Sequence, residues 1–254
     1  MSANQTTISS VERYAMRLGD DALIYGQRLC EWCAAAPTLE EDLALANVAL
    51  DFLGRTRMLY SYAGGVTGQT EDEIACARDA ASFENLLMVE LPRGDFAFSM
   101  GRQYLIDVFE ELFFSALIDS TDEELAGIAG KAIKEIHYHK RRSAKWMRRL
   151  GLGTDESRQR LQAAIDELWG YVDEFFAMDD LEQQLLAEGV AVDRTVLRDA
   201  WQREVCELLE AVGITVPGSE WQVSGGRAGV HTEYLGHLLS EMQFLQRAYP
   251  GLSW

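Results

Sequence analysis

Four residues of this sequence, Asp51, Asp107, Glu135 and His139, have the types and spacing that could bind a metal inside a helical bundle. Di-iron bundles take a Glu-x-x-His pair from each of two helices and one carboxylate from each of the other two. The three-residue spacing matters because residues i and i+3 lie on one face of a helix and reach the same metal. Such a centre therefore needs about six ligands that converge from four helices.

The second and fourth expected helices each lack half of their ligand pair. Gly54 lies three residues after Asp51, and glycine has no side chain that could coordinate a metal. Ile136 lies three residues before His139, where the pattern requires a carboxylate. The spacing thus predicts that ligands are absent at Gly54 and at Ile136.

The first expected helix shows the same kind of gap. Residues 22–30 contain no Asp or Glu, and Gln27 is the nearest polar side chain. Asp20 and Asp21 lie closer to the start of the helix, so they could serve only if the helix were shifted along its axis.

The third expected helix supplies Asp107 as a candidate lone carboxylate, followed by Glu110 and Glu111. We interpret the two glutamates as solvent-facing. An iron site requires several carboxylates and histidines that converge, and too few remain here. The sequence therefore predicts no metal and no other cofactor in this chain.

Glu135, His139 and Arg142 favour another use of the bundle interior. Glu135 and His139 are four residues apart and share a helix face, so spacing alone does not exclude a ligand pair. Together with Arg142, however, they fit a buried network of hydrogen-bonded charges. Such a network would neutralise inward carboxylates, and Arg57 is a further candidate cation.

The elements that would position these residues are all predicted to be helices. Ser9 with Glu12, and Thr121 with Glu124, form capping-box patterns at two helix starts. With only 4 prolines and 48% hydrophobic residues, the chain fits one all-α domain over residues 1–254. The expected helices are 9–36, 39–64, 95–120, 121–150, 154–178, 193–212 and 230–248.

The helix expected at 39–64 is apolar on two sides. One stripe, predicted to face the bundle core, consists of Leu39, Leu43, Ala46, Leu50, Leu53 and Tyr60. A second stripe, which we expect a partner protein to cover in part, consists of Leu45, Val48, Phe52 and Leu59.

Composition excludes several classes of function. The formal net charge of −18 and the pI near 4.6 argue against nucleic-acid binding and against an anionic membrane surface. The N-terminus has no apolar signal-peptide core, and no apolar run is long enough to span a membrane. We therefore expect a cytoplasmic protein. The glycine-rich loop 225–229 could bind a phosphate through backbone N–H groups, although such loops are also common connectors.

Three stretches, residues 18–57, 131–151 and 229–251, carry a resemblance to a known family; they include LGDDALIYGQRLCEWC, KEIHYHKRRSAKW and GVHTEYLGHLLSEMQFLQ. The sequence resembles the non-catalytic, ferritin-like subunit of bacterial phenylacetyl-CoA epoxidases, which are multicomponent oxygenases. The resemblance implies a ferritin-like four-helix bundle with additional C-terminal helices and a role in phenylacetate catabolism. It also implies a homologous catalytic subunit as partner, which holds the di-iron centre, and further subunits of the same complex.

The resemblance also implies where a metal site would once have been. The ligand positions of the catalytic relative fall at or near Leu23 or Gln27, Asp51, Gly54, Asp107, Ile136 and His139. Only Asp51, Asp107 and His139 keep side chains that coordinate metals, as a degenerate remnant of a di-iron site.

Two other hypotheses follow from the same residues. In the first, the chain is a di-iron or di-manganese enzyme that uses Glu135, His139, Asp51, Asp107 and a displaced aspartate of the first helix. In the second, it is a stand-alone helical scaffold without any connection to an oxygenase.

Overall fold

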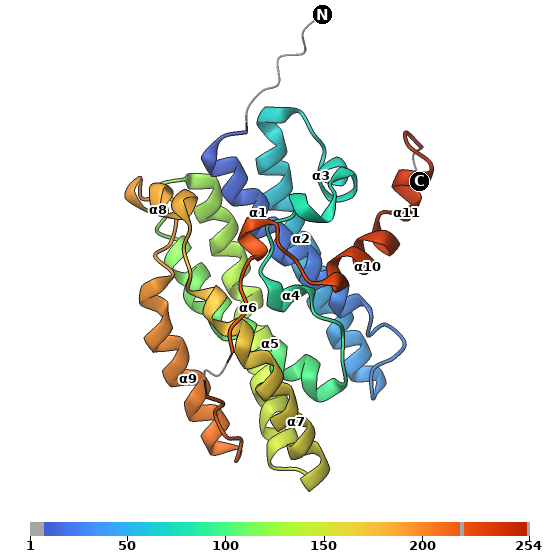
Figure 1. The fold of residues 1–254 in the computed structure, drawn as a ribbon, viewed down its shortest axis with the longest axis vertical. Coiled ribbons are helices and arrows are strands. Elements are labelled where there is room, and N and C mark those ends of the chain that lie inside the picture. Colours follow the sequence, from blue (N-terminus) through green and yellow to red (C-terminus); the bar gives the residue numbers. More distant parts are fainter. Residues whose placement is uncertain (1–7, 219–220, 253–254) are drawn as a thin grey trace, which may run out of the picture.

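The computed structural model describes residues 8–218 and 221–252, and within these ranges the chain forms helices and loops but no β-strand. The predicted all-α class is therefore confirmed (Figure 1). The α-helices are α1 Ser10–Cys30, α2 Leu39–Thr67, α3 Glu71–Ala77, α4 Leu87–Glu90, α5 Phe96–Leu117, α6 Glu123–Gly151, α7 Asp155–Leu168, α8 Asp180–Ala187, α9 Arg198–Ala211, α10 Glu233–Met242 and α11 Phe244–Ala248. Short 3₁₀ segments lie at Ala80–Ser82, Trp169–Phe175, Thr195–Leu197 and Gly226–Ala228.

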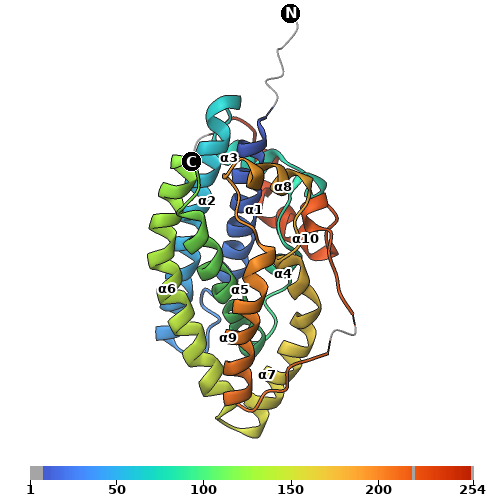
Figure 2. The ribbon, with the colours of Figure 1, turned by 90° about the vertical axis from the view of Figure 1, so that its left-hand side faces the viewer.

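The four long helices α1, α2, α5 and α6 form the ferritin-like bundle. α1 packs along α2, α5 packs along α6, and α2 also contacts α6. α7 and α9 cover α5 from outside the bundle, so every residue from Ala97 to Glu110 on α5 is buried. Figure 2 shows α6 and α2 together at one edge of the molecule, with α7, α8, α9 and α10 away from that edge.

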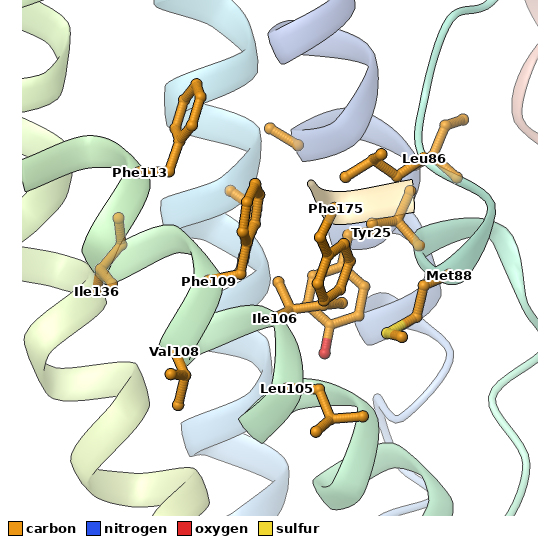
Figure 3. Packing of buried hydrophobic residues seen from close by; sticks show 14 of the residues in the cluster. Tyr25, Leu86, Met88, Leu105, Ile106, Val108, Phe109, Phe113, Ile136 and Phe175 are labelled. Carbon is orange, nitrogen blue, oxygen red and sulfur yellow. The ribbon is translucent and has the colours of Figure 1, made fainter. Parts of the chain in front are cut away.

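The core between α5 and the later helices is rich in aromatic side chains. Phe109 stacks on Phe175 with ring centroids 4.8 Å apart, and Trp201 lies against Phe175 from α9. Ile136 is fully buried, and Figure 3 shows it among the apolar residues that α6 and α5 share. Burial of such side chains, at about 25 cal/mol per Å² of apolar surface, is the main force that holds α7 and α9 to the bundle.

Helix ends show where local sequence rules succeed and where they fail. The Ser9–Glu12 capping box forms as predicted at the start of α1. The predicted Thr121–Glu124 box is wrong, because Asp122 is the N-cap of α6 and accepts from Leu125 N–H. The Thr121 backbone N–H instead donates to the Gly189 carbonyl, a contact that lies far away in the sequence.

α2 runs beyond its predicted end. Gly64 and Gly65 lie inside the helix, which ends at Thr67 and is followed by the C-cap Gly68 with a left-handed φ of 72°. The Gly68 N–H donates to the Gly64 carbonyl at 2.8 Å, and a Cβ on Gly64 would meet the Gln69 carbonyl oxygen at 2.2 Å. Glycine is therefore needed at Gly64 for close packing of the turn, and at Gly68 for the positive φ.

The later predicted helices are shorter than expected. The helix expected at 154–178 ends at Leu168 and continues as the 3₁₀ segment, and the one expected at 193–212 begins only at Arg198. The last one breaks at Gln243, whose buried amide donates to the carbonyls of Ala75 and Arg78. Those contacts fix the chain against the 71–82 segment and interrupt the helix.

The two stripes of α2 do not divide between core and surface as predicted. In the stripe assigned to the core, Leu39, Leu43 and Leu50 are 69%, 57% and 64% exposed, Ala46 and Leu53 are half-buried, and only Tyr60 is fully buried. The second stripe is fully buried within the chain: Leu45, Val48, Phe52 and Leu59. A partner cannot cover residues that the chain itself already covers, so that prediction is wrong.

The orientation of α2 follows from what its neighbours offer. Phe52 meets Tyr25 of α1 edge-on at 5.0 Å between ring centroids and stacks against His139 of α6 at 5.6 Å. Leu39, Leu43 and Leu50 of the other stripe are instead largely exposed. Sequence periodicity shows that α2 has two apolar sides, but only these tertiary contacts decide which side faces inward.

Candidate functional site

Asp51 and His139 lie together, as the hypothesis of a degenerate site requires. Asp51 Oδ2 and His139 Nε2 are 2.9 Å apart, His139 is buried, and Asp51 is about one-third exposed. Burial and the nearby cations Arg55 and Arg142 lower the pKa of His139, although the hydrogen bond to Asp51 acts in the opposite direction. The neutral imidazole therefore donates Nε2–H to Asp51, and its buried Nδ1 has no hydrogen-bond partner among the described residues.

Asp107 is fully buried and forms no hydrogen bond with that pair among the described residues. Ser143 Oγ donates to its Oδ2 at 2.6 Å, and its Oδ1 has no partner among the described residues. Burial, reinforced by the nearby charge of Glu110, raises the pKa of Asp107 well above its ordinary value. Burial therefore favours the protonated form of this carboxyl, which is a poor metal ligand.

The interior of the bundle at this level is filled by Arg55, a residue that the sequence patterns above did not single out. Its guanidinium Nη2 lies 3.0 Å from Glu110 Oε1, and both side chains are at least 90% buried. The guanidinium also lies over the rings of Phe52 and Phe114, at 4.4 and 4.7 Å from their centroids. The expectation that Glu110 faces solvent is therefore wrong.

A sequence signal for Arg55 did exist. The buried stripe of α2 runs Leu45, Val48, Phe52 and Leu59 with steps of three, four and seven residues, and Arg55 fills the missing step. The spacing of Arg55 therefore indicates that its side chain faces the interior of the bundle. Arg57, which was expected to supply an inward charge, is 77% exposed and pairs with Glu71.

Glu135, His139 and Arg142 do not form the predicted network with one another, and His139 and Arg142 instead pair with residues of α2. Arg142 Nη2 pairs with Glu41 Oε2 of α2, and no hydrogen bond or ion pair between the described atoms joins Glu135 to either other residue. Glu135 is half-buried, and burial together with the charge of Asp51 raises its pKa. The charges thus form separate cross-links between α2 and α6 instead of one network.

The positions assigned to lost ligands do not all face one point. Gly54 is exposed, and a Cβ on it would meet no atom within 4 Å, so it points away from the interior. Ile136 is part of the packed core. On α1, Leu23 is buried, whereas Gln27 lines an open surface hollow beside Arg28 and Cys30. At this level the inward residue of α2 is Arg55, not Gly54.

The two aspartates of α1 also pair with cations of the same chain. Asp20 is fully buried and accepts from Arg78 Nη1 at 3.0 Å. Asp21 accepts from Arg227 at 2.7 and 3.1 Å. Neither is therefore available as the displaced first-helix ligand of the enzyme hypothesis.

The enclosed space at the centre of the bundle is small. A cavity of about 30 Å³ lies between the charged side chains of Asp21, Arg55, Glu110, Arg194 and Arg227 and the surrounding apolar side chains. This is room for about one water molecule, whereas a small-molecule site usually needs about 300 Å³ or more. Within residues 8–218 and 221–252 no group of three or more His, Cys, Asp and Glu is placed to hold a metal ion. The arrangement does not fit a di-iron centre.

The chain is similar to known proteins. A family model described as phenylacetic acid catabolic protein matches residues 1–254. The chain belongs to this family. It is 47% identical over 248 residues to one subunit of the 1,2-phenylacetyl-CoA epoxidase of Escherichia coli strain K12, and the match covers 97% of this chain and 100% of that protein. In this family member, no helix of the described ranges is long and apolar enough to cross a bilayer.

The glycine-rich loop of this family member is engaged inside the molecule. The N–H groups of Gly225 and Gly226 donate to Glu174 Oε1 at 3.0 and 2.8 Å, and Arg227 pairs with Asp21. Burial raises the pKa of Glu174, although these backbone donors act against the rise. The groups that could have bound a phosphate therefore fasten the C-terminal segment to α1 and to the Trp169–Phe175 turn.

His231 fastens the same segment to α4. Its Nδ1 lies 2.7 Å from Glu90 Oε2 and its Nε2 lies 2.8 Å from the Phe83 carbonyl oxygen. Both partners accept, so both ring nitrogens carry a proton and the imidazole is a cation. Burial opposes this charge, but the two hydrogen bonds outweigh it and raise the pKa of His231.

This geometry predicts a pH-dependent stability. Because the pKa is raised in the folded state, the stabilisation by His231 is complete below about pH 6.5, the unfolded value, and is lost as pH rises through the folded pKa. We expect His231→Gln to lower the free energy of unfolding by about 2 kcal/mol at pH 6 and by less at pH 9. Urea unfolding at pH 6 and at pH 9 measures this loss of stability. Equal losses at both pH values would contradict a charged His231. The control is His237→Gln, which changes an exposed histidine of α10.

Proposed function

We propose that this chain is a structural, non-catalytic subunit of a cytoplasmic multicomponent oxygenase that epoxidises phenylacetyl-CoA. In this proposal it binds a homologous di-iron subunit and keeps that subunit in its active arrangement. The family membership and the 47% identity to a phenylacetyl-CoA epoxidase subunit support the connection to phenylacetyl-CoA. The bundle interior supports the non-catalytic role.

The ion pair between Arg55 and Glu110 is the observation that carries the non-catalytic role. Arginine keeps its positive charge at all relevant pH values, so its buried guanidinium repels a metal cation at the same place. The pair is completed by two aromatic rings that cover the guanidinium. The chain therefore supplies its own cation at the level of α2 and α5 where an enzyme of this fold would need ligands.

The first test of the proposal is the metal content of the chain. We expect chain purified from iron-supplemented cells to contain far less than one iron or manganese per molecule. Elemental analysis measures this directly. A value of about two metals per chain, as in di-iron bundles, would contradict the proposal and favour an enzyme in its own right.

A reconstitution experiment tests the structural role. The candidate catalytic subunit is produced with and without this chain, and epoxidation of phenylacetyl-CoA is followed by product formation. We expect the activity to require this chain, and Arg142→Met, which removes a cross-link to Glu41, to reduce the yield of complex without adding metal. Full activity of the catalytic subunit alone would overturn the proposed role and favour a scaffold unrelated to the oxygenase.

A further inference from the structure

Positive charge gathers on one helix of this strongly acidic protein. Residues 131–149 of α6 hold eight of the 23 lysines and arginines of the chain, with Glu135 as their only Asp or Glu. The chain as a whole carries 41 acidic residues and a formal charge of −18. Residues 131–149 of α6 therefore form a cationic strip on an otherwise acidic molecule.

The cations of this strip differ from the others in their pairing. Of the fifteen lysines and arginines outside residues 131–149, twelve form ion pairs within the chain. Within the strip only Lys140 and Arg142 do so among the described residues. The rest are exposed and form no ion pair with any residue of 8–218 or 221–252: Lys131, Lys134, Arg141, Lys145, Arg148 and Arg149. The protein has ample carboxylates, yet it leaves these six cations unmatched within those ranges.

The exposed side chains of α6 follow a regular spacing. Steps of four and three residues place them on one outward stripe that runs along much of the helix. Its members are Lys134, Tyr138, Arg141, Lys145, Arg148 and the C-cap residue Leu152, and Tyr138 and Leu152 are 45% and 66% exposed. At a rise of about 1.5 Å per residue, this stripe is about 27 Å long.

The exposed leucines of α2 lie beside this stripe. The antiparallel contact of the two helices is marked by the pairs Glu41–Arg142, Asp51–His139 and Tyr62–Asp122. The outward leucines of α2 therefore flank the cationic half of α6: Leu39, Leu43 and Leu50. Figure 2 shows α2 and α6 together at one edge of the molecule, and α7 and α9 also contact α6.

We propose that the outer face of α2 and α6 is the docking surface for the catalytic subunit, and that it binds an acidic, partly apolar stripe on that subunit. This inference rests on the proposed function and names the surface through which it operates. Charge complementarity selects an acidic partner, and it also raises the rate of association. The exposed leucines of α2 favour a protein partner over a small polyanion, because a small polyanion would bind the cations and leave the leucines exposed to water.

Other occupants fit this face less well. In a symmetric pair both copies use the same patch, so a second copy would offer the cations of α6 only this patch, which is not acidic. A nucleic acid would meet the net charge of −18 around the strip. A protein with carboxylates opposite α6 and apolar side chains opposite α2 satisfies both halves of the face.

Charge reversal on the exposed stripe of α6 tests the cationic part of the proposed docking surface. The triple variant Lys134→Glu/Arg141→Glu/Lys145→Glu changes only exposed side chains that form no ion pair with the described residues, so we expect an unchanged melting temperature. Its affinity for the catalytic subunit, measured by titration calorimetry at about 50 mM salt, should fall about 100-fold. Arg203→Glu, an exposed arginine of α9, is the matched control and should bind like wild type.

A second variant tests the apolar half. Leu43→Glu/Leu50→Glu should weaken the complex about 100-fold without loss of cooperative unfolding, because both leucines are largely exposed. Leu245→Glu, an exposed leucine of α11, is the control for adding a negative charge at an apolar surface position. Binding of the catalytic subunit should also weaken as salt is raised from about 50 to about 500 mM.

The outcomes separate this inference from the proposed function. If wild type binds the catalytic subunit and both variants bind it equally well, the surface is wrong and the structural role stands. If wild type does not bind it at all, the proposed function is wrong and the inference falls with it. If inorganic tripolyphosphate binds the strip while the complex stays intact, the strip is an anion site and the docking assignment is overturned.

Discussion

Arg55→Met is expected to lower the free energy of unfolding by about 3–5 kcal/mol, because it leaves Glu110 buried without its counter-charge. Methionine keeps most of the side-chain length and its contacts with the rings of Phe52 and Phe114, so the loss reports chiefly on the ion pair. Against a typical domain stability of about 5–15 kcal/mol, this is a large fraction. Urea unfolding monitored by circular dichroism at pH 7.5 measures it.

The pH dependence of this variant distinguishes a lost charge pair from a packing defect. Burial already raises the pKa of Glu110, and Arg55 acts against that rise. Without Arg55 the folded pKa rises further above the unfolded value, so the variant regains stability as pH falls and Glu110 takes up a proton. We therefore expect a smaller loss at pH 5 than at pH 8.

Two matched variants complete the experiment. Arg55→Met/Glu110→Leu removes both charges and should recover most of the stability, since an apolar pair can replace a buried ion pair at little cost. Arg57→Met, two residues away on the same helix but 77% exposed, should change stability by no more than about 0.5 kcal/mol. If Arg55→Met and Arg57→Met lower the free energy of unfolding equally, the buried ion pair adds no stability beyond that of an exposed one.

Local patterns in the sequence predicted the helices better than their orientation. The all-α class and the Ser9–Glu12 cap follow from interactions within a few residues, and both are present. The cap at Thr121 failed because the choice between Thr121 and Asp122 depends on a contact with Gly189. A contact between residues so far apart in the sequence leaves no trace in the local pattern.

The candidate site shows the same division between local and tertiary information. The nearness of Asp51 and His139 was anticipated, because a bundle brings inward residues of α2 and α6 together. The partners of Arg142, Asp20 and Asp21 were not, because Glu41, Arg78 and Arg227 come from segments whose placement periodicity cannot give. Charge pairing in this interior is therefore a property of the tertiary fold.

The orientation of α2 leads to the prediction with the largest effect of all. Phe52→Glu is expected to abolish cooperative folding, whereas Leu50→Glu, two residues earlier, should leave the melting temperature nearly unchanged. Phe52 is fully buried between Tyr25, His139 and Arg55, whereas Leu50 is 64% exposed. Removing a buried phenylalanine side chain costs about 3–5 kcal/mol, and a buried carboxylate without a partner adds several more.

Thermal unfolding of the two variants, with the yield of soluble protein, measures the contrast between the two sides of α2. Both substitutions introduce the same glutamate into the same helix, so helix propensity and added charge are matched and only the direction of the side chain differs. A Phe52→Glu protein that melts like wild type would mean that this stripe faces outward and is free for a partner. Loss of folding in Leu50→Glu would mean that the exposed leucines belong to the core. The predicted pair of results requires that the buried stripe holds the bundle together, which leaves the leucines of the opposite side free to meet another protein.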